Sequence, residues 1–117
     1  RNAALFVSIH VNAFTDSEPH GATIYYFKPQ DLALSEAINR RIASEVTALQ
    51  NDGVRKGKYY VIHHASMPAA LIEAGFLTNP ADRAVLTSPD WQQRMAVAIA
   101  DGIKDYTNSL DSASANQ

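Results

Sequence analysis

The sequence predicts one α/β domain in which a mostly parallel sheet carries helices on both faces. Segments typical of strands and of helices alternate along the chain, which is the pattern of a layered α/β fold. The first strand-like segment is not fully polar on either face, as expected for a strand covered on both sides. Of 117 residues, 46 % are hydrophobic, including four Phe, five Tyr and one Trp, which is enough for a globular core.

Composition narrows the possible partners and sites. Ten Lys and Arg against twelve Asp and Glu give a net charge of −2, without the basic excess that a nucleic-acid-binding protein concentrates on one face. The absence of cysteine excludes a disulfide framework and a thiolate zinc site. No apolar run approaches the ~20 residues that span a bilayer, and Arg1 does not open a signal peptide. We therefore expect neither a nucleic-acid partner nor a membrane span.

The chain begins almost directly on a strand-like run, residues 3–11. Alternate side chains on this run point to opposite faces, so two partly apolar faces are predicted. Residues 15–21 are rich in turn formers, and residues 22–27 form the second predicted strand. One face of the first strand carries Leu5, Val7, Ile9 and Val11, and the other carries Phe6, Ser8 and His10.

The predicted first helix starts at residues 28–31 and carries an apolar stripe with a spacing of three to four residues. We expect it to end at residues 51–53, with Gly53 as the C-terminal cap. Residues 59–62 and 69–73 are then predicted to be the third and fourth strands. The residues of the stripe are Leu34, Ile38, Ile42, Val46 and Leu49.

Two further helix starts follow in the C-terminal third. Asn79 precedes Pro80 as an N-cap residue precedes the first helical position, and Ser88-Pro89-Asp90 repeats this pattern. The tail from Asn108 onward is small and polar. The predicted division is therefore a domain at 1–107 and a disordered tail at 108–117.

Two residues depart from the apolar pattern of their strands. His10 lies near the carboxyl end of the first strand, where α/β sheets form ligand sites, although a core histidine bonded to a neighbour is the alternative. Glu73 follows a run of apolar residues. Burial there would raise its pKa and suit a general acid or base. A glutamate that faces water at the strand end, or pairs with a base, is the alternative for Glu73.

Other polar residues give weaker indications. In a strand, alternation sends the His63 and His64 rings to opposite faces, so the two are not expected to bind one metal. Surface placement is the plainer interpretation for this pair, with one ring lining a pocket as the other possibility. Arg55, Lys56 and Lys58 form a small basic cluster, interpreted as a solvated loop.

Two segments of the sequence resemble the signature motifs of one known enzyme family. The segment Ser8-Ile9-His10-Val11-Asn12-Ala13 resembles one signature of the zinc-dependent N-acetylmuramoyl-L-alanine amidases, the amidase-3 family. The segment at 67–79, Met-Pro-Ala-Ala-Leu-Ile-Glu-Ala-Gly-Phe-Leu-Thr-Asn, resembles the second signature of that family. The resemblance runs from Leu5 to Tyr106, with matching elements between the two motifs.

The resemblance implies an enzyme that hydrolyses the amide between N-acetylmuramic acid and L-alanine of the peptidoglycan stem. It implies that His10 is a zinc ligand and that Glu73 is the catalytic glutamate, which exchanges protons with a zinc-activated water. Asn12 and Ala13 would lie along the substrate path, with turn formation as the alternative. His63 stands where family members often carry an Arg that contacts substrate. Extracytoplasmic action, in the periplasm or cell wall, is also implied.

The resemblance also implies that part of the domain is missing. Two other zinc ligands of the family lie upstream of the position matched by Arg1, and a catalytic zinc needs three protein ligands. We therefore expect a C-terminal portion that lacks its N-terminal elements and is inactive alone. A non-catalytic peptidoglycan-binding or regulatory remnant is the alternative. Missing strands would leave an apolar sheet edge, through which we expect the chain to self-associate.

Overall fold

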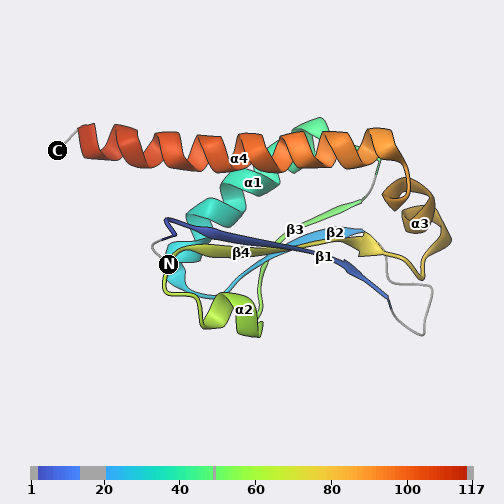
Figure 1. The fold of residues 1–117 in the computed structure, drawn as a ribbon, viewed down its shortest axis with the longest axis horizontal. Helices are drawn as coiled ribbons and strands as arrows, with labels where there is room; N and C mark the ends of the chain where they lie inside the picture. Colours follow the sequence, from blue (N-terminus) through green and yellow to red (C-terminus); the bar gives the residue numbers. More distant parts are fainter. Residues whose placement is uncertain (1–2, 14–20, 49, 116–117) are drawn as a thin grey trace.

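A computed structural model describes residues 3–13, 21–48 and 50–115. Its centre is a four-stranded sheet in the order β1-β4-β2-β3 (Figure 1). Strand β1 (Phe6–Asn12) runs parallel to β4 (Ala69–Phe76), and β2 (Ala22–Tyr26) runs parallel to β3 (Asn51–Lys56). The central pair, β2 and β4, is antiparallel. Two of the three strand pairs are parallel, which confirms the predicted mostly parallel sheet.

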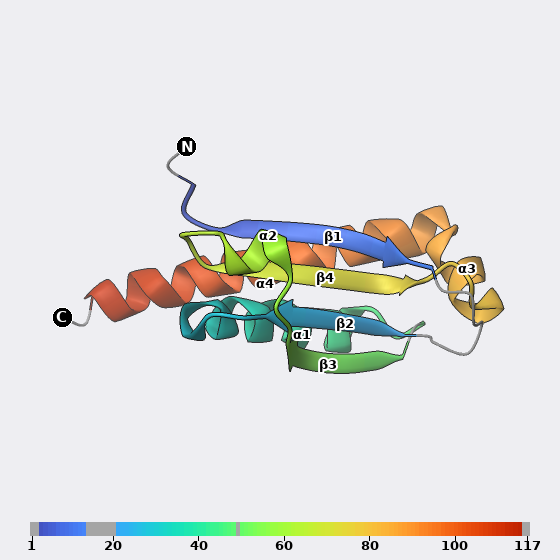
Figure 2. The same ribbon diagram turned by 90° about the horizontal axis from the view of Figure 1, so that it is seen from below.

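The helices cover the two faces of the sheet unequally. Helices α1 (Leu32–Glu45) and α4 (Pro89–Ala115) pack side by side on one face, and the one-turn helix α2 (Tyr60–His63) lies on the other (Figures 1 and 2). The short helices η1 (Pro29–Asp31) and α3 (Pro80–Leu86) connect these layers. Within the described residues, much of the sheet face on which α2 lies therefore has no helix over it.

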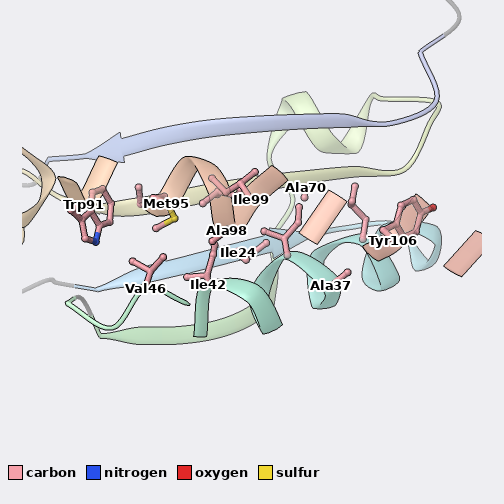
Figure 3. Packing of buried hydrophobic residues seen from close by; sticks show 14 of the residues in the cluster. Ile24, Ala37, Ile42, Val46, Ala70, Trp91, Met95, Ala98, Ile99 and Tyr106 are labelled. Atoms are coloured by element: carbon pink, nitrogen blue, oxygen red, sulfur yellow. The ribbon is translucent and has the colours of Figure 1, made fainter. Parts of the chain in front are cut away.

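The main core lies between the sheet and the α1/α4 layer. Ile24 and Ala70 face this layer from the strands and meet side chains of both helices (Figure 3). The two helices approach closely at Gly102, where an added Cβ would lie 2.5 Å from the Ile38 Cα. The other labelled members of the cluster are Ala37, Ile42, Val46, Trp91, Met95, Ala98, Ile99 and Tyr106.

The predicted end of the first helix is wrong. Helix α1 ends at Glu45, and the segment expected to cap it forms strand β3 instead. Gly53 does have positive φ (82°), but it lies within β3, where its N–H donates to the Asn51 side chain at 2.7 Å. Pairing with β2 and packing of Val54 against the main core explain the strand, because such long-range contacts override local turn preference.

The predicted strand at 59–62 is also wrong, because this segment forms α2. The helical turn is closed by the His63 N–H donating to the Tyr59 carbonyl at 2.8 Å. No described strand pairs with the segment, and its one fully buried side chain, Ile62, packs against Ala69 and Leu71. The prediction that His63 and His64 point to opposite faces fails with it, since their ring centroids are 4.5 Å apart.

The two C-terminal helix starts are confirmed. The Asn79 side chain accepts a hydrogen bond from the Asp82 N–H at 3.1 Å, as an N-cap residue should. Helix α4 begins at Pro89 but continues to Ala115, so residues 108–115 are helical where composition suggested a disordered tail. None of the described helices is long and apolar enough to cross a membrane. Most of the predicted turn at 15–21 lies outside the described residues.

Candidate active site

The parallel pairing of β1 with β4 places His10 and Glu73 at the same register position. Their side chains lie on the same face of the sheet. Ile72 and Ala74 of β4 join the core beneath α1 and α4, so the residue between them, Glu73, faces the opposite side. His10 and Glu73 are thus neighbours on the less covered sheet face, although they are 63 positions apart in the sequence.

Glu73 is buried within β4, with a side chain that is only 6 % exposed. Its Oε2 atom has no hydrogen-bond partner within the described part of the chain. Burial raises the pKa of this carboxyl, and the neighbouring His10 acts in the opposite direction. The structure therefore contradicts a glutamate that faces water. A buried carboxyl with a raised pKa is suited to act as a general acid or base.

His10 is exposed on the edge strand β1. Its Nε2 shares a 2.8 Å hydrogen bond with the Ser8 Oγ, two residues earlier on the same face. The interpretation of His10 as a core histidine is therefore wrong. An imidazole that is accessible and oriented by a neighbouring hydroxyl is suited to bind a ligand or a metal ion.

Asn12 and Ala13 follow directly after His10. A β-bulge separates His10 from Asn12, whose backbone carbonyl accepts a hydrogen bond from the Leu77 N–H at 2.7 Å. This bond ties the end of β1 to the turn after β4. Ala13 is exposed just beyond the strand. Both residues lie next to the His10 end of the site, and the Asn12 backbone has a structural role there.

His63 is not brought to the His10–Glu73 pair. It lies on α2, with its ring edge-on to Phe27 at 4.7 Å between centroids. Phe27 follows β2 beyond the Tyr25–Leu71 pair, so it lies at the far end of β4 from Glu73. At ~3.3 Å per residue, the level of Ala69 is about 13 Å from that of Glu73. His63 thus belongs to the same sheet face but to a different part of it.

Two tyrosines occupy the space between these parts. The Tyr25 and Tyr59 rings have centroids 4.8 Å apart. Burial, a hydrogen bond to Tyr25 and the charges of Tyr25 and Glu73 together raise the pKa of Tyr59 to about 12. Neither tyrosine was predicted in the site, since residues 22–27 were identified only as a strand and residues 59–62 were predicted to be another. The contact depends on the helical turn at α2, which the sequence did not reveal.

Two buried carboxylates hold the elements of the site together. The Asp82 Oδ2 accepts hydrogen bonds from the Phe76 N–H at 3.0 Å and from the Gly21 N–H at 2.8 Å. Asp31 accepts a hydrogen bond from the Ala69 N–H at 2.9 Å, at the start of β4. Asp31 lies in the segment predicted to start the first helix, and Asp82 follows the predicted start at Asn79-Pro80, but the sequence gave no indication of these long-range bonds.

The described residues contain no group of three or more His, Cys, Asp or Glu side chains placed to hold a metal ion. His10 and Glu73 are therefore two potential donors rather than a complete metal centre. Their arrangement, an accessible imidazole beside a buried acid, supports proton transfer at a ligand bound over this sheet face.

The fold and this pair of residues define an α/β domain with an acid–histidine site on one face of a mixed sheet. The chain belongs to the amidase-3 family, described as N-acetylmuramoyl-L-alanine amidase, which its sequence matches over residues 1–105.

Named relatives agree with this assignment. The chain is 35 % identical over 104 residues to the probable cell wall amidase LytH of Staphylococcus epidermidis, covering 89 % of this chain and 35 % of the relative. It is 35 % identical over 107 residues to the N-acetylmuramoyl-L-alanine amidase LytC of Bacillus subtilis, covering 89 % of this chain and 22 % of the relative. The chain thus spans about a third or less of these relatives.

Solved structures share the fold. The catalytic domain of the amidase CwlV from Bacillus (Paenibacillus) polymyxa var. colistinus superposes with a TM-score of 0.85 at 38 % identity. That match covers 91 % of this chain and 59 % of the CwlV chain. The amidase AmiC2 of Nostoc punctiforme gives a TM-score of 0.85 at 37 % identity, covering 92 % and 59 %.

Proposed function

We propose that this chain is part of the catalytic domain of an N-acetylmuramoyl-L-alanine amidase. The reaction is hydrolysis of the amide that joins the lactyl group of N-acetylmuramic acid to L-alanine of the stem peptide. Family membership and the names of the relatives support the substrate class. The observation that carries the proposal is Glu73, a buried carboxyl beside His10 within the family's second motif.

Glu73 is the proposed general base and general acid. As a carboxylate it accepts a proton from the water that attacks the amide carbonyl, and a new C–O bond forms. It then delivers that proton to the amine nitrogen as the C–N bond breaks. The products are a free lactyl carboxyl group and the amino group of the stem peptide. The raised pKa of Glu73 favours the protonated state that the second step requires.

We propose His10 as one zinc ligand, oriented by its hydrogen bond to Ser8. A catalytic zinc has three protein ligands and an open position, and it polarises a carbonyl and lowers the pKa of bound water. The described residues supply one histidine here and no group of three donors, so by themselves they do not fit a catalytic zinc.

Asn12, Ala13 and His63 are proposed substrate contacts. The first two follow His10 at the end of β1, and His63 lies on the same sheet face at α2. Action in the periplasm or cell wall is proposed from the named cell wall amidases among the relatives. A second candidate function, peptidoglycan binding without cleavage, is favoured by the incomplete donor set around His10.

Release of stem peptides from purified peptidoglycan, with and without added zinc, tests the amidase proposal. In any active form that includes this chain, Glu73→Ala should abolish cleavage and leave bound zinc unchanged, whereas His10→Ala should reduce both. Glu36→Ala, on the exposed side of α1, is the matched control and should remain active. An active Glu73→Ala variant would contradict the assigned role. Binding of peptidoglycan without any cleavage would favour the second candidate.

We also propose self-association through β1. This strand forms an edge of the described sheet and carries neither Lys nor Pro, the residues that commonly protect edges. Ile9 and Val11 are 57 % and 45 % exposed and line an apolar groove beside Ile99 of α4. Sedimentation velocity should show a concentration-dependent dimer that weakens in Ile9→Lys. A monomer at all concentrations would overturn this proposal.

A further inference from the structure

A basic, aromatic surface lies on the same sheet face as Glu73. We call it the α2 platform and define it by six residues of α2 and the segments beside it. Its members belong to three stretches of sequence that meet only in the folded chain. They are Phe27, Lys56, Lys58, Tyr60, His63 and His64.

The rings of the α2 platform form a continuous series of contacts. The Lys56 Nζ lies 5.6 Å from the centroid of the Phe27 ring, which meets His63 at 4.7 Å. His63 contacts His64 at 4.5 Å, and His64 contacts Tyr60 at 4.2 Å. Basic and aromatic groups are therefore joined in one surface rather than scattered.

The surface is positive although the whole chain is negative. Residues 53–72 contain Arg55, Lys56 and Lys58 and no Asp or Glu, whereas the net charge of the chain is −2. Burial lowers the pKa of His63, and the neighbouring charges of His64, Lys58 and Lys28 lower it further. The nearby Asp31 is fully buried and paired with Lys28 at 3.1 Å. The exposed charge of the platform is thus available for an anionic partner.

The platform is held firmly by the fold. Ile62 is fully buried beneath it, and its carbonyl accepts a hydrogen bond from the Lys28 Nζ. Tyr60 nevertheless directs its ring outward and is 76 % exposed. An exposed aromatic ring on an anchored element provides contact area at a small entropic cost on binding.

The distance to Glu73 matches the reach of a short peptide. The platform lies about 13 Å from the level of Glu73 along β4, with Tyr25 and Tyr59 between them. An extended peptide spans at most ~3.3–3.6 Å per residue, so about four residues cover this distance. A peptide whose first amide lies at Glu73 would therefore place its carboxylates near Lys56 and Lys58.

We propose that the α2 platform docks the acidic stem peptide of peptidoglycan. Lys56 and Lys58 pair with the carboxylates of the stem, and the Tyr60 ring packs against its backbone. The choice of this occupant rests on the proposed amidase function and on the charge complementarity between a basic surface and an acidic peptide. Docking here would hold the scissile amide over Glu73.

Co-sedimentation with peptidoglycan sacculi freed of phosphate polymers tests the proposal. A Glu73→Gln background prevents cleavage during the measurement. In that background the double change K56E/K58E should weaken binding at least tenfold, and Tyr60→Ala should weaken it severalfold. Tyr60→Phe should keep binding, because the ring remains. The matched control, R40E/K104E, makes the same change in charge on the exposed side of the α1/α4 layer and should bind normally.

A second arm identifies the part of peptidoglycan that is recognised. Glycan strands from which a known amidase has removed the stems should bind at least tenfold more weakly than intact sacculi. Equal binding of stripped strands, normal binding by K56E/K58E, or no binding by the background protein would each overturn the proposal. Cleavage is measured separately, in an active form that includes this chain with Glu73 intact, so that a failure of docking and a failure of the amidase proposal can be told apart.

Discussion

Asp31 connects three segments of the fold that the site depends on. Its side chain is fully buried between the end of β2, the start of α1 and the start of β4. Its Oδ2 accepts hydrogen bonds from the backbone N–H groups of Phe27 at 3.2 Å and Lys28 at 2.8 Å. Its Oδ1 accepts from the Ala69 N–H at 2.9 Å and lies 3.1 Å from the Lys28 Nζ.

Asp31→Ala should therefore cost the domain a large part of its stability. The change removes the acceptor of three backbone N–H groups and leaves the Lys28 ammonium without its counter-ion. Hydrogen bonds to charged groups contribute about 1.5–3 kcal/mol each, but those to one carboxylate are not additive. We expect a loss of about 3–5 kcal/mol, the range typical of breaking a buried ion pair. A domain of ordinary stability, about 5–15 kcal/mol, would then be only marginally folded.

Urea unfolding followed by circular dichroism measures this loss. Asp31→Asn keeps one acceptor oxygen, so it should lie between wild type and Asp31→Ala. Asp90→Ala is the matched control, because Asp90 pairs with Arg94 in an exposed ion pair at 2.9 Å. The control should unfold at the urea concentration of the wild type, since such pairs contribute little. An Asp31→Ala variant within about 1 kcal/mol of wild type would refute the reasoning.

Two other changes test the helix layer and the site acid. Gly102→Ala places a Cβ 2.5 Å from the Ile38 Cα, so the helix backbones must separate, and we expect a loss of about 1–3 kcal/mol and a lower Tm. A Tm equal to wild type would contradict the close packing. Because burial raises the pKa of Glu73 above its ordinary 4.5, ionisation opposes folding. In metal-free buffer, wild type should therefore lose stability relative to Glu73→Gln as pH rises from 4.5 through the raised pKa. A constant difference between the two across this range would argue against burial of the charge.

The sequence predicted the elements whose patterns are local. Strands β1, β2 and β4 follow from short, largely apolar runs, α1 from a stripe with helical spacing, and the start of α4 from Ser88-Pro89-Asp90. The start of α3 follows from Asn79 and Pro80, where one side chain caps the helix and one ring fits its first position.

The elements that were predicted wrongly depend on distant partners. Strand β3 is polar except for Val54, and only its pairing with β2 makes it a strand. The run at 59–62 has the composition of a strand but has no described strand beside it, so burial of Ile62 selects a helical turn. In both places tertiary contacts outweigh local propensity.

The site was predicted residue by residue but not as an arrangement. His10 and Glu73 each departed from a local pattern, which identified them singly. Their adjacency depends on the sheet order, in which β4 rather than β2 lies next to β1. Local spacing does not encode this order or the register within it, since both are set by packing across the whole sheet.

The alternation of side chains along β4 links the stability of the core to the geometry of the site. Ile72 is fully buried against the α1/α4 layer, and the next residue, Glu73, points to the other face. A shift of one residue in register would bury the Glu73 carboxyl in the apolar core and expose Ile72 to water. Both changes would strongly lower the free energy of unfolding of the domain. The apolar packing of one sheet face therefore fixes the position of the acid on the other. Variants of the site should accordingly be compared only after the unfolding of each has been measured, because a loosened core would displace Glu73 without altering any residue that surrounds it.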